Sequence, residues 1–189
     1  MVRWNRLFAD LDARMENASA QERAGTVAEL VRAEEAGALL VDRLRAAGAG
    51  TVVLQTYDGA SHTGVVAQVA TQWVLLEATI GGSARDVVVP TAAIETVGGL
   101  GPRAAAPRED IASRLTLSHA LRRLARDRVV VEVRTRSGSS CLGRIDRVGS
   151  DHLDVAAAYG WGERGARDAR ATTVAFSALA SVAEAAQTI

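Results

Sequence analysis

The most constraining feature of this chain is a pattern that occurs twice, 79 residues apart. "TYDGASHTGVVAQVATQWVLL" begins at Thr56, and "TRSGSSCLGRIDRVGSDHLDV" begins at Thr135. Identity is low, six of 23 positions between 56–78 and 135–157, but glycines and apolar positions align without a gap. Further on, "VVVPTAAIETV" and "TTVAFSALASV" align at an offset of 85, so the second repeat carries six extra residues. We therefore predict an internal repeat of one helix and five short strands, against the alternative of two unrelated β segments.

The second strand of each predicted repeat carries a glycine followed by two apolar residues that lie three positions apart. A regular strand would place two such residues on opposite faces. Both can face the core only if the strand bends or bulges between them, which a glycine tolerates. We predict this bend in both repeats, in the strands that contain Gly64, Val66 and Val69, and Gly143, Ile145 and Val148.

The order of the predicted elements resembles a known fold. A helix, an apolar strand closed by "DG" or "SG", the glycine strand, "WVLL" or "HLDV" and a final strand pair are similar to the Sm-like fold of Sm and Hfq proteins. Related SH3-like small barrels share the pattern, which covers 38–97 and 117–182. The resemblance implies an α+β chain: an N-terminal α-helical segment, then two tandem five-stranded Sm-like or SH3-like antiparallel β-barrels, each preceded by a helix. It also implies RNA binding, but the family's RNA-contact positions are not retained: an Asp position holds Ala70 and Gly149, and an Asn position falls near Val74 and Leu153.

Four segments follow from this interpretation. Residues 1–48 form N-terminal helices, including one continuous helix from Gln21 to Ala47 that would span roughly 40 Å. Residues 49–97 form the first small barrel, and residues 98–113, rich in Gly, Pro and Ala, form a linker. Residues 114–184 form a helix and the second small barrel.

The charges are unevenly distributed, although the net charge is zero. Residues 49–97 carry a net charge of −3, whereas residues 114–147 carry +6. An arginine surface can neutralise nucleic-acid phosphates, so we predict RNA binding by the second repeat. The alternative is a solvated face balanced by acids of the first repeat or of a partner chain. The predicted nucleic-acid-binding residues are Arg122, Arg123, Arg126, Arg128, Arg134, Arg136, Arg144 and Arg147.

A protein partner is the second functional possibility. Tyr159 and Trp161 lie in the glycine-rich insertion "YGWGERGARDAR", where an exposed aromatic residue suits partner contact. Open strand edges also attract further strands. The alternative function is therefore a protein-interaction scaffold or assembly module that uses the N-terminal helices and the barrel edges. We expect a homo-oligomer, either a dimer or a trimer that forms a pseudo-hexameric ring.

Catalytic and metal-site patterns are lacking in the sequence. His62, His119 and His152 fall in different predicted elements without metal-ligand spacing. Asp58 is explained as a hairpin residue, and Cys141, the single cysteine, as a buried thiol on a strand. We therefore predict a non-catalytic protein without a cofactor or metal. A single cysteine, no signal-peptide pattern and no long apolar run favour a cytoplasmic protein that has no contact with a membrane.

Overall fold

The computed structural model describes residues 29, 32, 33, 36–80, 82–106, 113–160 and 171–185, without the side chains of residues 80 and 157–160. The chain divides into two units, residues 1–39 and 40–189. In the first unit, residues 29, 32, 33, 36 and 37 are helical, whereas Ala38 and Leu39 are not. The prediction of one continuous helix up to Ala47 is therefore wrong at this point. The part of the predicted N-terminal helices that precedes Gln21 lies outside the described residues.

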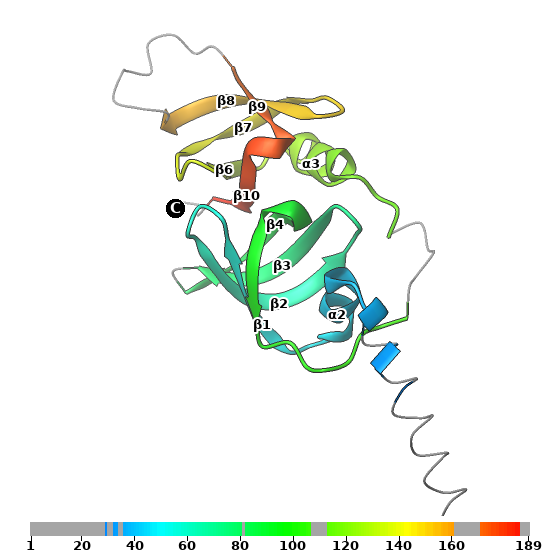
Figure 1. Ribbon diagram of the computed structural model, residues 1–189. Helices are drawn as coiled ribbons and strands as arrows, with labels where there is room; N and C mark the ends of the chain where they lie inside the picture. Colours follow the sequence, from blue (N-terminus) through cyan, green and yellow to red (C-terminus); the bar gives the residue numbers. More distant parts are fainter. Residues whose placement is uncertain are drawn as a thin grey trace, which may run out of the picture. The chain divides into compact units, whose positions relative to one another are not determined.

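The second unit is built on one antiparallel sheet of ten strands in the order β5-β1-β2-β3-β4-β10-β6-β7-β8-β9 (Figure 1). Two α-helices, α2 (Leu40–Ala46) and α3 (Leu117–Arg126), are described in this unit, and none of the described helices is long and apolar enough to cross a bilayer. The strands are β1 (Thr51–Thr56), β2 (Ser61–Val69), β3 (Trp73–Ile80), β4 (Ser83–Pro90), β5 (Ile94–Gly98), β6 (Val130–Thr135), β7 (Ser140–Val148), β8 (His152–Gly160), β9 (Thr172–Ala175) and β10 (Leu179–Glu184). Two short 3-10 helices, η1 (Thr91–Ala93) and η2 (Phe176–Ala178), precede β5 and β10.

The prediction of two five-stranded barrels, each preceded by a helix, is wrong. The strands form a single open sheet, because β4 of the first repeat pairs with β10 of the second, Val88 opposite Val182 and Val87 opposite Ala183. A strand from the other repeat, β10, therefore covers the apolar edge of β4. This pairing satisfies the backbone groups of β4, as closure of the first repeat into a barrel would also have done. Alternating apolar residues indicate which face of a strand is buried, but not which strand lies beside its edge.

The two repeats share one strand order, β5-β1-β2-β3-β4 in the first (51–98) and β10-β6-β7-β8-β9 in the second (130–184). They also share one register, except for a further shift between Leu142 and Gly143 in the second repeat. Val52 pairs with Gly64 as Val131 pairs with Gly143. The register of β1 with β5 shifts after Gln55, and the register of β6 with β10 shifts at the corresponding place. The offsets of 79 and 85 that align the sequence therefore also align the backbone hydrogen-bond pattern.

The predicted bend in the second strand is confirmed in both repeats. The pairing of β2 with β3 shifts between Val66 and Gln68, and that of β7 with β8 shifts between Ile145 and Arg147. The role of Gly64 differs from the predicted tolerance of curvature. A Cβ atom on Gly64 would lie 2.3 Å from the carbonyl oxygen of Glu77, so this glycine allows β2 and β3 to approach closely.

The hydrophobic cores of the two repeats each include residues of the other repeat. The core of the first repeat includes Leu44 of α2 and Ala183 of β10. The core of the second repeat includes Leu121 of α3 and also Trp73 of β3, which is 3% exposed. The Trp73 indole donates a hydrogen bond to the carbonyl of Leu115, 3.0 Å away, just before α3. Trp73 therefore joins the two repeats.

Candidate nucleic-acid interface and the junction between the repeats

Asp58 anchors the junction between the repeats. It lies in the β1–β2 hairpin, where Gly59 has a φ of +81° and follows the turn signal predicted from the sequence. Arg134 of β6 donates from Nε to Asp58 Oδ2 at 2.8 Å, and the Asp58 side chain is fully shielded from solvent. The Thr56 hydroxyl donates to Asp58 Oδ1 at 2.6 Å. Asp58 is therefore more than a hairpin residue: it forms an ion pair with the other repeat.

The pKa of Asp58 reflects this environment. Burial alone would raise it, but hydrogen bonds from Thr56, Arg134 and the Ala60 amide, together with the charge of Arg134, hold the pKa below its usual value. Arg134 also lies 3.5 Å from the Glu132 carboxylate. The Asp58 carboxylate is therefore kept ionised, and Arg134 is neutralised by acidic residues on both sides.

Tyr57 and Arg136 form a second contact across the junction. The Tyr57 hydroxyl donates to the main-chain carbonyl of Leu179 in β10. The guanidinium of Arg136 lies over the Tyr57 ring, 4.2 Å from its centroid, which is within cation–π range. Burial raises the pKa of Tyr57, so its hydroxyl group stays protonated and remains a hydrogen-bond donor.

His62 lies close to this ion pair and is 7% exposed. Its Nε2 atom is buried and has no hydrogen-bond partner among the described residues. Burial lowers the pKa of His62, Asp58 and Glu132 oppose that shift, and Arg134 adds to it. His62 is therefore neutral near pH 7, because a protonated side chain is unfavourable at this buried position.

The eight predicted arginines do not form one surface. Arg134 and Arg136 belong to the junction between the repeats. For Arg134, the charge is balanced by an acidic residue of the first repeat, which was the alternative to nucleic-acid binding. The other six are all exposed. They separate into two groups, which we name the α3 arginines (Arg122, Arg123, Arg126 and Arg128) and the β7 arginines (Arg144 and Arg147).

The α3 arginines lie on the solvent side of α3 and in the turn that follows it. The opposite side of α3 carries Leu117 and Leu121, which are buried in the core of the second repeat. Arg122 also reaches the carbonyls of Val148 and Gly149, both at 3.4 Å, close to the upper limit for a hydrogen bond. Within the described ranges, no ion pair involves any α3 arginine. Four guanidinium groups are therefore available to one ligand.

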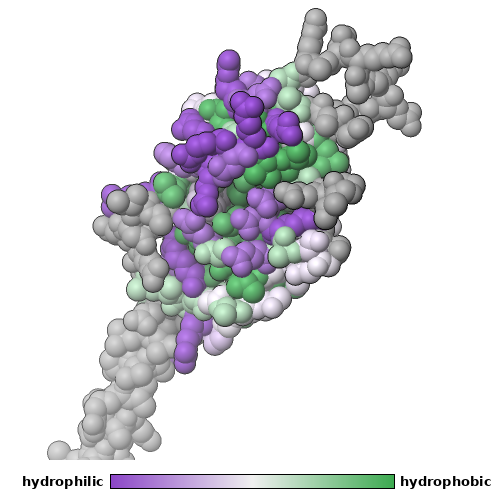
Figure 2. Space-filling model, turned by 180° about the vertical axis from the view of Figure 1, so that it is seen from behind, coloured by the Kyte–Doolittle hydropathy of each residue, from purple (hydrophilic) through white to green (hydrophobic). Residues whose placement is uncertain are grey.

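The β7 arginines face another side of the sheet. Cys141 and Ile145 of β7 are buried with α3 over them, whereas Arg144 alternates with them and is exposed. Arg147 is paired in register with Asp154 of β8. Seen from behind, strongly hydrophilic side chains gather over the second repeat, the upper part of Figure 2. The sheet separates the α3 arginines from the β7 arginines. One nucleic-acid strand would therefore contact only one of the two groups, unless it bent around the sheet edge.

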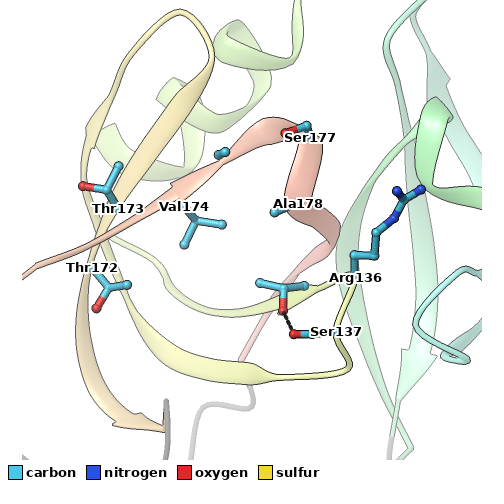
Figure 3. Close-up of a pocket in the computed structure, with 9 residues that line it drawn as sticks. Arg136, Ser137, Thr172, Thr173, Val174, Ser177 and Ala178 are labelled. Atoms are coloured by element: carbon cyan, nitrogen blue, oxygen red, sulfur yellow. Dashed lines mark hydrogen bonds between the residues drawn. The ribbon is translucent and has the colours of Figure 1, made fainter.

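An open groove lies beside β9, the edge strand of the second repeat among the described residues. It has a volume of about 530 Å³ and is lined by hydroxyl groups and small side chains. Thr135 and Ser137 of the β6–β7 hairpin are hydrogen-bonded to each other at 3.0 Å (Figure 3). The side chain of Arg136 extends away from the other lining residues (Figure 3). The lining residues are Thr135, Arg136, Ser137, Thr172, Thr173, Val174, Ala175, Ser177 and Ala178.

The remaining candidate residues contribute less to this picture. Trp161 lies outside the described residues, and Tyr159 belongs to β8 by its backbone alone. The described histidines lie in β2, α3 and β8. Among the described residues, no cluster of His, Cys, Asp or Glu could hold a metal ion. Cys141 is buried on β7, as predicted.

Comparisons of the chain with protein-family models, with curated proteins and with solved structures found no match. The resemblance to the Sm-like fold therefore stays a prediction. The function rests on the geometry of the chain itself.

Proposed function

We propose that this chain is a non-catalytic binding protein that binds single-stranded nucleic acid, RNA in the first instance, through the α3 arginines. The observation that supports this is the gathering of four exposed arginines on one helix and its following turn, with no acidic partner in the described part of the chain. A phosphate backbone presents a row of negative charges to such a surface, and binding would release condensed counterions. Arginine also donates in a planar fork that matches a phosphate group.

A structural role for the same residues is the competing interpretation. Arg123 and Arg126 lie in the last turn of α3, where a cation stabilises the helix dipole. That role needs one or two cations at the helix end. It does not account for Arg122 and Arg128, which lie outside that turn and are exposed.

A fluorescence-anisotropy titration of the full chain with mixed-sequence single-stranded RNA tests the proposal. We expect binding that weakens steeply between 50 and 200 mM salt, with a slope that falls by about 0.7 for each phosphate contact removed. Substituting Arg122, Arg123 and Arg126 together by Gln should abolish most of the affinity. Arg103→Gln, which removes an exposed cation elsewhere in the chain, is the matched control.

The β7 arginines provide the internal comparison. If Arg144→Gln with Arg147→Gln weakens binding more than the α3 triple variant, the interface lies on the other side of the sheet. Absence of salt-dependent binding at 50 mM salt would refute the proposal for nucleic acid altogether.

We also propose that the chain self-associates, as a dimer or trimer, which would make it an assembly module. The support is that the ten-stranded sheet is open, so β5 and β9 each have one edge without a partner strand among the described residues. Unpaired edges of this kind pair with further strands unless they are protected. Sedimentation velocity over a hundredfold concentration range tests this, and a monomer throughout would contradict it.

A further inference from the structure

Arg128 has a backbone conformation that arginine rarely adopts. Its φ is +51°, and within the described part of the chain it is the one residue other than glycine with a positive φ. In this region the Cβ atom of an L-residue crowds the backbone, which costs free energy for residues other than glycine. The turn itself does not require arginine, because the Arg128 amide donates to the Ala125 carbonyl at 3.2 Å, as a glycine amide would.

The first repeat has a glycine at the equivalent position. α2 ends at Ala46 and α3 at Arg126. The second residue after each end has a left-handed backbone: Gly48, with a φ of +56°, and Arg128. Glycine is the usual residue where a helix ends in this way. It would satisfy the turn in both repeats, so the arginine of the second repeat needs another reason.

The side chains near the two helix ends also differ. In α2, Arg45 forms an ion pair with the buried Asp42 at 2.6 Å. Arg43 donates to the carbonyl of Gly101 at 3.0 Å, and so holds the chain that follows β5. Four positions before the end of α3, in the place of Asp42, lies Arg122, and α3 contains no acidic residue. The arginines of α2 are therefore engaged within the chain, whereas α3 lacks the acid that would engage its own.

The guanidinium of Arg128 is exposed and available to a ligand. Among the described residues, no hydrogen bond or ion pair involves the side chains of Arg123, Arg126 or Arg128. A cation near a helix end also favours the helix dipole, but Arg123 and Arg126 already occupy the last turn of α3. Arg128 lies two residues before the start of β6, so it extends the α3 arginines beyond the helix.

We propose that Arg128 is retained in this strained conformation because its guanidinium contacts a phosphate of the bound RNA. A residue that is unfavourable for folding and makes no side-chain contact in the folded chain is typical of a binding site. Arg128 adds one phosphate contact past the end of α3, and the bound strand continues from the helix toward β6. This inference rests on the function proposed above. It adds that the second repeat is less stable than its backbone allows, and that the difference serves binding.

Replacing Arg128 by glycine tests the inference, because stability and binding should change in opposite directions. Arg128→Gly should raise the thermal unfolding midpoint by about 2–4 °C, since the backbone strain is removed. The same variant should bind mixed-sequence single-stranded RNA about tenfold more weakly in low salt, with a salt-dependence slope smaller by about 0.7. Arg128→Lys keeps the charge and the strain, so its unfolding midpoint and its salt-dependence slope should stay close to those of the unmodified chain.

Gly48→Arg is the matched control in the first repeat. A Cβ atom at Gly48 would meet nothing within 4 Å, so the substitution introduces the backbone strain without a clash. It should lower the unfolding midpoint by about 2–4 °C. Because Arg43 and Arg45 are already engaged, the added arginine has no neighbouring free arginines to act with, and RNA affinity should stay nearly unchanged.

Three results would overturn the inference. A lower unfolding midpoint in Arg128→Gly would show that the arginine stabilises the end of α3. Unchanged RNA affinity in that variant would show that Arg128 is not a contact. An increase in affinity in Gly48→Arg as large as the loss in Arg128→Gly would show that binding follows net charge alone. The first two results leave the proposed function intact if the α3 triple variant still loses affinity, whereas an unmodified chain without salt-dependent binding would refute both.

Discussion

The β1–β2 hairpin and the β6–β7 hairpin have nearly the same backbone and different environments. In both, the threonine amide donates to the carbonyl four residues on, at 2.9 Å, and a glycine adopts a φ near +80°. The first hairpin then places Tyr57 and Asp58 against the other repeat, whereas the second places Ser137 beside an open groove. The difference teaches that turn residues determine the backbone of each repeat, and that a few side chains at the hairpin tip determine what the repeat meets.

Trp73 gives the largest expected difference between equivalent positions. Trp73→Ala should lower the free energy of unfolding by about 3–5 kcal/mol, because it leaves a cavity in the core of the second repeat and removes the hydrogen bond to Leu115. The counterpart, His152, has a side chain that is 39% exposed. His152→Ala should change stability by less than about 0.5 kcal/mol. Urea denaturation of both variants measures the contrast, and similar costs would contradict a core shared between the repeats.

Gly64 tests whether the two repeats have equivalent backbones. Gly64→Ala should cost about 3 kcal/mol, since the added Cβ meets the backbone of Glu77 and not a flexible side chain. Gly143 holds the same register opposite Ala157, so Gly143→Ala should cost a similar amount. Gly101→Ala, where a Cβ atom meets nothing within 4 Å, is the control. Urea midpoints measure all three, and a small cost at Gly64 alone would show that β2 and β3 separate easily.

The two partners of the ion pair between Asp58 and Arg134 should differ in how much stability is lost when each is replaced. Arg134→Gln, which introduces the residue of the equivalent position 55, leaves the shielded Asp58 carboxylate unpaired and should cost about 1–3 kcal/mol. Asp58→Ser, which introduces the residue of position 137, should cost less, because Arg134 is partly exposed and keeps Glu132. Thermal unfolding at pH 7 measures both. Equal values would mean that Asp58 reaches solvent when Arg134 is removed.

His62 gives the smallest expected effect, seen in the pH dependence of stability. Because burial lowers the pKa of His62, the unfolded chain binds this proton more readily than the folded chain does. The free energy of unfolding should therefore fall as the pH drops below about 6.5. His62→Cys, with the residue that occupies the equivalent position 141, should flatten this part of the profile under reducing conditions. The stabilising Asp58 carboxylate is lost only at lower pH, below its usual pKa, so the two contributions separate.

The sequence predicted the repeat, its offsets and the bend in the second strand of each repeat. These depend on local chemistry: a glycine where two strands approach closely, and apolar spacing that shifts by one residue at the bulge. It did not predict the single sheet, because strand edges carry no side-chain signal for their partner. The arginines of the candidate site were found by counting charges along the chain. The alternation of Arg134 and Arg136 with apolar positions could not show that Asp58 and Tyr57 would lie beside them.

The pairing of β4 with β10 joins residues that lie far apart in synthesis as well as in sequence. Val88 can pair with Val182 only after a further 94 residues have been synthesised. At translation rates of about 5–20 residues per second, the valine edge of β4 is uncovered for roughly 5 to 20 seconds on the ribosome. During that time it is a hydrophobic strand edge of the kind that aggregates. The last strand of the described residues is thus the one that covers this edge of the first repeat.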